Sequence, residues 1–134
     1  MISKQIDFEN IEWKITPYEG VYVSCLDREE NPNNSKISKS TTHAVKVEAN
    51  HEIGLHYHER EKDWTEFIIF PQGGNIEISN KGNPRSFSGP KPVYLRVNSG
   101  ETYGIRNMDN EMPLFLISIM KPGFTDYKEI KDGL

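Results

Sequence analysis

The feature that most constrains the fold is a series of short segments in which apolar and polar residues alternate. Strand side chains point to opposite faces with period two, so this alternation is typical of strands with one buried face. Glycine, proline and asparagine recur between the segments, where they would interrupt a long helix. The predicted strands are residues 11–15, 20–26, 41–48, a stretch around His56, 66–70, 75–79, 92–97, 102–106 and 113–120. Residues 81–92 are expected to form a loop, with room for one more short strand around residues 85–87. About nine short strands with no helix between them predict an all-β sandwich or barrel, closed to protect its edges.

Two connections and one terminal segment are also predicted. The Gly73–Gly74 pair is expected to close an antiparallel hairpin between residues 66–70 and 75–79. Residues 27–40 are polar and rich in turn-forming residues, so they are expected to form a loop. Residues 124–130 are expected to form a short terminal helix or strand.

Length and charge limit the classes of protein to consider. A chain of 134 residues is expected to fold as one domain. Its formal net charge is -4 and its basic residues are scattered, which argues against nucleic acid or an anionic membrane as a partner. The first fifteen residues lack the apolar core of a secretion signal, and no apolar run is long enough to span a membrane. We therefore expect a cytoplasmic protein.

The single cysteine and the N-terminal aromatic residues are expected to be structural. Cys25 is the only cysteine in the sequence, so an intrachain disulfide and any zinc site built from several thiolates are excluded. A metal would need nitrogen and oxygen ligands. Its place in the apolar segment 20–26 predicts a buried, inert thiol. Segments 11–15 and 20–26 are expected at an edge of a sheet. Trp13 and Tyr18 are then expected to pack at that edge.

A candidate metal site lies in residues 54–73. His56 and His58 stand two residues apart, so on a strand both imidazoles leave the same face and converge on one point. Glu66 begins the next apolar strand, and its carboxylate joins the imidazoles if that strand lies beside the first. Two imidazoles and one carboxylate suit Fe, Mn, Ni, Zn or Cu and leave positions open for water or substrate.

The order of these residues resembles the first motif of the cupin family, which runs Gly, five residues, His-x-His, three or four residues, Glu, six residues, Gly. Asn50 stands at the first glycine, five residues before His56, and six residues separate Glu66 from Gly73. Asparagine tolerates the left-handed backbone that a tight turn requires. The gap between His58 and Glu66 is seven residues, longer than in the family motif. The alternative carboxylates in this gap are Glu59 and Glu61.

A later stretch resembles the second cupin motif, which runs Pro-x-Gly, two residues, His, three residues, Asn. Gly100 and Asn107 are in register, whereas Asn98 replaces the proline and Tyr103 replaces the metal-binding histidine. The two motifs occupy about residues 50–73 and 98–107. The resemblance implies one cupin domain over residues 1–134, folded as a double-stranded β-helix or jelly-roll barrel. It also implies a small-molecule ligand inside the barrel and a homodimer that pairs through outer strands.

Three functions remain open. In the first, His56, His58 and Glu66 bind a divalent metal, as in metal-dependent oxygenases or isomerases, and Tyr103 is a fourth ligand or a hydrogen-bond donor. In the second, which resembles the sugar epimerases of the family, His56 or His58 is a general base and Tyr103 a general acid acting on sugar phosphates or nucleotide sugars. In the third, the chain is a non-catalytic barrel that binds a small ligand. The arginines that a phosphate would need are dispersed in the sequence: Arg60, Arg85, Arg96 and Arg106.

Three further side chains have structural explanations. Trp64 precedes a buried strand and is expected to pack in the core or at an interface, with stacking on a ligand as the alternative. His43 shares a strand face with Val45 and Val47, so we expect a core histidine that is at most a reserve ligand. His51 is expected to be exposed in the turn before the histidine pair.

Overall fold

The computed structural model describes residues 1–33, 38–58, 63–80 and 83–122. Within these ranges every regular element is a β-strand. The strands are β1 (Lys14–Ile15), β2 (Val21–Glu29), β3 (Ser40–Val47), β4 (Glu52–Tyr57), β5 (Thr65–Phe70), β6 (Ile76–Asn80), β7 (Arg85–Phe87), β8 (Val93–Asn98), β9 (Thr102–Asn107) and β10 (Leu114–Lys121). The predicted all-β class is confirmed, and in the described ranges no helix is long and apolar enough to cross a membrane.

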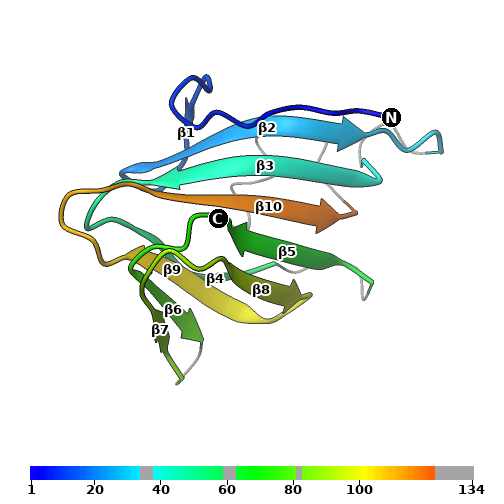
Figure 1. Cartoon of the computed structure of the whole chain (residues 1–134). Helices are drawn as coiled ribbons and strands as arrows, with labels where there is room; N and C mark the ends of the chain where they lie inside the picture. The colour runs from blue at the N-terminus through cyan, green and yellow to red at the C-terminus, as the bar shows by residue number, and fades with distance from the viewer. Residues whose placement is uncertain (34–37, 59–62, 81–82, 123–134) are drawn as a thin grey trace.

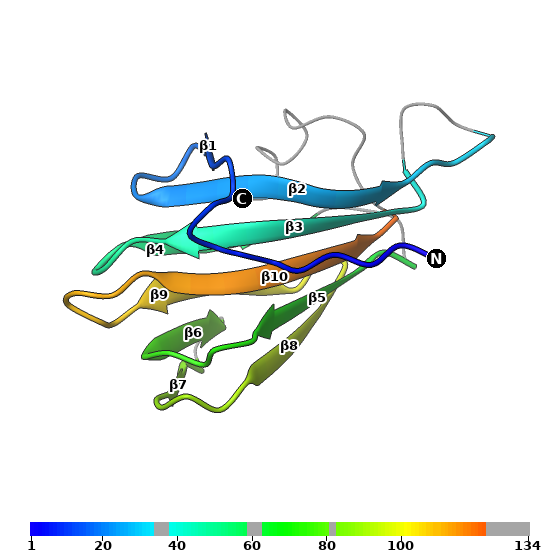
Figure 2. The same ribbon diagram turned by 45° about the horizontal axis from the view of Figure 1, so that its top comes forward.

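The strands form two antiparallel sheets that face each other across one core. The six-stranded sheet has the order β1-β2-β3-β10-β5-β8, and Figure 1 shows its long strands side by side. The four-stranded sheet has the order β4-β9-β6-β7 and forms the second layer in the turned view of Figure 2. A single hydrophobic cluster joins the inner faces of both sheets. Its most deeply buried aliphatic and phenyl side chains are Val21, Val47, Ile68, Phe70 and Leu116 from one sheet and Ile76 and Ile105 from the other.

Strand β10 shows how the sequence pattern produces this core. It lies between β3 and β5, and alternate residues from Leu114 to Met120 are buried. A strand paired on both sides and covered on its inner face excludes water from those residues, which explains why it is the most apolar strand. The inward position between Leu116 and Met120 is occupied by Ser118, and this one polar residue belongs to the candidate site described below.

The predicted hairpin across Gly73–Gly74 is wrong. Strand β5 pairs with β10 and β8, whereas β6 pairs with β7 and β9 in the other sheet. The glycine pair therefore carries the chain from one sheet to the other. Gly73 has a φ of 66°, and a Cβ atom built on it would lie 2.2 Å from the carbonyl oxygen of Gly89. Glycine is thus required at this position by a close backbone approach and not by a two-residue hairpin turn.

The N-terminal strands lie at the sheet edge, as predicted, but β2 is longer than expected. It runs to Glu29 and β3 begins at Ser40, so part of the segment 27–40 is strand and not loop. Cys25 is exposed, which contradicts the predicted buried thiol. The register between β2 and β3 shifts after Cys25, and there the edge strand leaves the core that covers Val21 and Val23. The predicted terminal element at 124–130 lies outside the described residues.

Two asparagines of the cupin-like motifs stabilise the fold. Asn50 has a φ of 61°, which confirms the left-handed turn expected there. The Asn107 side chain is buried, and its amide nitrogen donates hydrogen bonds to the carbonyls of Val47 at 3.0 Å and Met112 at 2.8 Å. The first bond reaches the end of β3, and the second reaches the loop before β10. Asn107, the final asparagine of the second motif, therefore links β9 to the other sheet.

Candidate functional site

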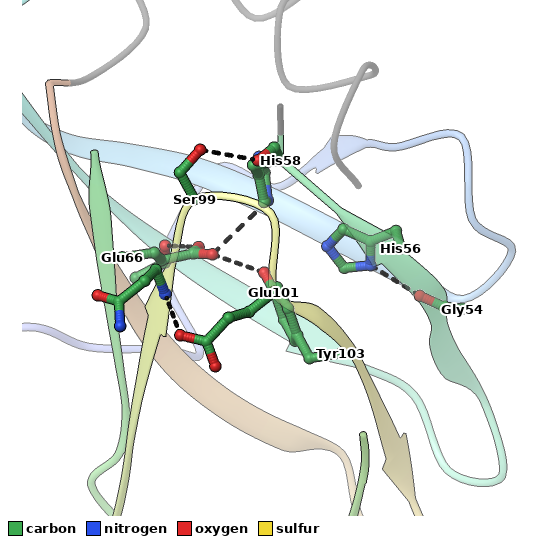
Figure 3. Close-up of polar contacts among 9 residues, drawn as sticks. Gly54, His56, His58, Glu66, Ser99, Glu101 and Tyr103 are labelled. Atoms are coloured by element: carbon green, nitrogen blue, oxygen red, sulfur yellow. Dashed lines mark hydrogen bonds and ion pairs between the residues drawn. The ribbon is translucent and has the colours of Figure 1, made fainter. Parts of the chain in front are cut away.

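The predicted site residues meet between the two sheets. His56 lies on β4 and His58 directly follows that strand, so both rings leave its inner face, with centroids 5.3 Å apart. Tyr103 is the register partner of His56 on β9. Glu66 lies on β5, and its carboxylate reaches the site from the opposite sheet (Figure 3). The Glu66 strand does not lie beside the histidine strand, and the carboxylate instead approaches the imidazoles across the interior.

The Glu66 carboxylate is the centre of the polar contacts. Tyr103 donates its hydroxyl hydrogen to Oε1 at 2.6 Å, and Ser118 donates a short hydrogen bond to Oε2. His58 Nε2 lies 3.6 Å from Oε1. Two ligands of one tetrahedral metal ion lie about 3.4 Å apart when each is 2.0–2.2 Å from the ion. The observed separation of nitrogen and oxygen is therefore close to that of two atoms sharing a metal.

The His56 ring has a defined tautomer. Its Nδ1 lies 2.7 Å from the carbonyl oxygen of Gly54, and a carbonyl can only accept, so Nδ1 carries the proton. The opposite nitrogen, Nε2, is then an acceptor, and it is buried with no hydrogen-bond partner among the described residues. In Figure 3 it faces the space between His58 and Tyr103. A backbone carbonyl that orients one ring nitrogen while the other stays available is the usual arrangement of a metal-ligating histidine.

His58 is held both through its backbone and through its ring. Its carbonyl accepts hydrogen bonds from the Gly100 amide at 2.9 Å and, at 3.5 Å, from the Ser99 hydroxyl (Figure 3). Its ring stacks on Trp64 with centroids 4.6 Å apart and an angle of 28° between planes. Trp64 is fully buried, so its expected role in the core is confirmed, and it also forms a wall of the site.

Burial shifts the pKa of Glu66, Tyr103 and His56. It raises the pKa of the Glu66 carboxyl, and hydrogen bonds from Ser118 and Tyr103 oppose that shift. The pKa of Tyr103 lies well above its usual value, through burial first and the neighbouring Glu66 carboxylate second, so its hydroxyl stays protonated near neutral pH. Burial lowers the pKa of His56, and the hydrogen bond to Gly54 opposes that shift. His56 therefore stays neutral near pH 7, as a metal ligand or a general base must.

A small cavity extends inward from the Glu66 carboxylate. Its volume is about 20 Å³, enough for one water molecule. Polar groups from His43, Glu66, Tyr103 and Ser118 border it, and the rest of its wall is aliphatic or thioether. His43 is buried as expected, its Nδ1 has no hydrogen-bond partner among the described residues, and burial followed by the charge of Arg28 lowers its pKa to about 4. It is a core histidine at the inner end of the site.

Other predicted site residues do not join the cluster. His51 does lie in the turn before the histidine pair, but it is half-buried where exposure was expected, and its ring bonds the carbonyl of Ala49 at 2.9 Å. Glu59, Glu61 and Arg60 lie outside the described residues. In the part of the chain that the structure describes, no group of three or more His, Cys, Asp or Glu side chains is already arranged around a metal position.

Two residues of the site were missed by sequence reasoning. The Tyr18 ring, expected to pack at an edge, has its centroid 6.3 Å from that of His56, and Tyr18 is close enough to Tyr103 to contribute to the raised pKa of that residue. Nothing in the local sequence indicates this contact. Ser118 carried a usable signal, because it is the single polar residue at an inward position of β10.

Comparisons with known proteins agree with this architecture. No protein-family model matches the sequence, and no curated protein sequence matches it. Among solved structures, the cupin domain of Schizosaccharomyces pombe Cnp3 is similar with a TM-score of 0.65 and 16% identity, covering 95% of this chain and 72% of that one. The polyketide cyclase RemF from Streptomyces resistomycificus has a TM-score of 0.63 and 12% identity over 93% of this chain and 83% of its own.

A third similar structure is described as a predicted oxalate decarboxylase from Thermotoga maritima. It has a TM-score of 0.63 and 19% identity and covers 89% of this chain and 99% of that one. Identities this low establish a common architecture and not a common activity. The chain has the cupin fold, a double-stranded β-helix, and the resemblance noted in its two motifs is confirmed at that level.

Proposed function

We propose that this cupin barrel binds a divalent transition metal through His56 Nε2, His58 Nε2 and a Glu66 carboxylate oxygen, and a small molecule beside it. The observation that carries the proposal is the buried Nε2 of His56, which is kept unprotonated by the Gly54 contact and has no partner among the described residues. Fe, Mn, Ni, Zn and Cu all accept this set of nitrogen and oxygen donors.

The environment of Glu66 supports the same site. Its carboxyl group is fully buried, and its close partners are two neutral hydroxyls and the His58 ring. A buried carboxylate is costly unless a cation or several hydrogen bonds compensate for lost solvation. A divalent ion between this oxygen and the two imidazole nitrogens would supply the missing positive charge.

The roles of the chain's own residues follow from their contacts. Tyr103 and Ser118 hold the two oxygens of Glu66, and Trp64 fixes the plane of the His58 ring. A metal bound here would act as a Lewis acid on a carbonyl or hydroxyl oxygen, or would bind dioxygen. Tyr103 stands where the family has its fourth ligand, and its hydroxyl orients the Glu66 carboxylate, so a metal held by the other three residues would keep a position free for a small molecule.

Metal-free acid–base catalysis is the second candidate. It is favoured by the unprotonated His56 Nε2 and by the ring of Tyr103, whose centroid lies 4.3 Å from that of His56. However, the Tyr103 hydroxyl already donates to Glu66 and its pKa is well above the usual value, so it is a weak acid. Arg96 is also poorly placed to bind a phosphate in the site, since its guanidinium lies over the outward ring of Phe67 at 5.7 Å. We therefore rank this candidate, and a non-catalytic binding barrel, below the metal site.

Replacing His56 with alanine should weaken metal binding at least about 100-fold, because even residues that only support a metal ligand are worth 10–100-fold in affinity. The measurement is calorimetric titration of chelator-treated protein with Zn²⁺. His51→Ala is the matched control, since it removes a half-buried histidine outside the site and should leave the affinity unchanged. Equal dissociation constants for wild type and His56→Ala would contradict the assignment.

The homodimer and the cytoplasmic location expected from the sequence stay predictions. Trp13, expected at an edge contact, stacks within the chain on Phe115 at 6.2 Å. One face of the Trp13 indole is therefore covered by a residue of the same chain. The oligomeric state is measured directly by light scattering.

A further inference from the structure

A second, larger hollow lies where the two sheets separate. It has a volume of about 230 Å³ and is bordered by β6, β7, β8 and the start of β9. Pockets for drug-sized ligands run from about 300 to 1,000 Å³, so this cleft is suited to a smaller molecule. Tyr103 lines both this cleft and the inner cavity that contains Glu66. The cleft therefore approaches the proposed metal site from outside.

Register determines which side chains enter the cleft. Arg85 is the partner of Ile78, and Asn80 is the partner of Tyr103. Directly paired residues in antiparallel strands project from the same face of a sheet. Ile78 and Tyr103 are buried on the inner face, so the side chains of Arg85 and Asn80 also leave that face.

The polar groups at this edge are available for a ligand. Among the described residues, neither the Arg85 guanidinium nor the side-chain amide of Asn80 has a hydrogen-bond or ion-pair partner within the protein. Glu101 also borders the cleft, and its Oε1 accepts a hydrogen bond from the Asn98 amide at 3.0 Å (Figure 3). Its other carboxylate oxygen can accept from a hydroxyl group. The opposite wall is apolar and is formed by Leu95 and Val97 of β8.

We propose that this cleft binds a small hydroxylated carboxylate, with Arg85 pairing with its carboxylate and Asn80 and Glu101 contacting its hydroxyls. A guanidinium forms two parallel hydrogen bonds with a carboxylate. Arg85 is the one basic side chain that enters the cleft from the described residues, because Arg96, which also borders it, stacks over Phe67. With Glu101 nearby and a net charge of -4, a singly charged carboxylate is favoured over a doubly charged phosphate ester.

This inference rests on the proposed function only in making the bound molecule the small-molecule partner of the metal site. The test is titration of ¹⁵N-labelled full-length protein with D-gluconate, followed by amide NMR shifts, with and without one equivalent of Zn²⁺. Glucose is the uncharged comparison and glucose 6-phosphate the doubly charged one. We expect gluconate to shift amides near Asn80 and Glu101, and Arg85→Gln to weaken its binding about tenfold to a hundredfold.

Arg106→Gln is the matched control. Arg106 lies on β9 and is exposed, and its partner Glu77 projects from the outer face, so the same charge is lost outside the cleft. Gluconate affinity should stay within about twofold of wild type in that variant. Equal weakening in both variants, glucose binding as tightly as gluconate, tighter binding of glucose 6-phosphate, or shifts confined to other surfaces would each overturn the proposal. If the wild-type protein binds gluconate in an Arg85-dependent way but does not bind Zn²⁺, the metal site is overturned and the cleft proposal stands.

Discussion

Replacing Trp64 with alanine lowers the free energy of unfolding by about 3–5 kcal/mol, the range for removal of a large buried aromatic side chain. Trp64 is 1% exposed and is the largest fully buried side chain among the described residues. The substitution also removes the ring on which His58 stacks. We therefore expect weaker metal binding in the same variant, because the plane of the His58 imidazole is no longer fixed. Urea denaturation measures the first effect.

Two variants separate the causes of the Trp64 effect. Trp64→Phe retains a ring beside His58 and removes an indole N–H that has no partner among the described residues, so its loss of stability should be less than half that of alanine. Trp13→Ala removes the same side chain from a half-buried position on the outer face and should cost about 1 kcal/mol. A loss at Trp64 no larger than that at Trp13 would mean that Trp64 is not in the core.

His43 should make the protein less stable as the pH falls from 7 to 4. Its pKa is about 4 in the folded protein against 6.5 for an ordinary histidine. Between these values the unfolded chain binds a proton that the folded protein does not, so the free energy of unfolding decreases as the pH is lowered through this window. At 1.36 kcal/mol per pKa unit, the loss is about 3 kcal/mol by pH 4.

His43→Leu should lose that part of the pH dependence. Urea denaturation at pH 7 and pH 4 gives the pH-induced change in the free energy of unfolding for each protein. The difference between the wild-type change and the His43→Leu change is the contribution of His43. The lowered pKa of His56 acts in the same direction, and the raised pKa of Glu66 acts in the opposite one, but both groups remain in the variant and cancel. His51→Leu controls for the loss of a histidine elsewhere. Identical pH dependence in wild type and His43→Leu would contradict a buried, neutral His43.

The strands could be predicted because their cause is local. Alternation in β10 and β6 reflects one buried face, and each of these strands lies within one residue of its predicted range. The choice of partner strand is not local. Gly73–Gly74 has the composition of a hairpin turn, yet here the chain crosses from one sheet to the other. Gly73 is needed because its backbone lies against the Gly89 carbonyl, where a Cβ atom would clash. Only the packing of the two sheets determines that outcome.

The same distinction applies to the site. His56 and His58 could be found because their spacing alone places both rings on one face, and Glu66 because its spacing to Gly73 follows a known motif. Ser118 is 52 residues from Glu66 in the sequence, so their hydrogen bond depends on β10 lying next to β5. The burial of Cys25 was predicted wrongly because an apolar neighbourhood in sequence does not reveal where an edge strand leaves the core.

Everything proposed for this site depends on His56, His58 and Glu66 holding a transition metal. Elemental analysis of the protein purified without added metal or chelator, normalised to protein concentration, tests it most directly. The proposed site predicts about one equivalent of Fe, Mn, Ni, Zn or Cu per chain. A protein that is metal-free on purification and stays so after incubation with each of these ions and removal of the excess would contradict it.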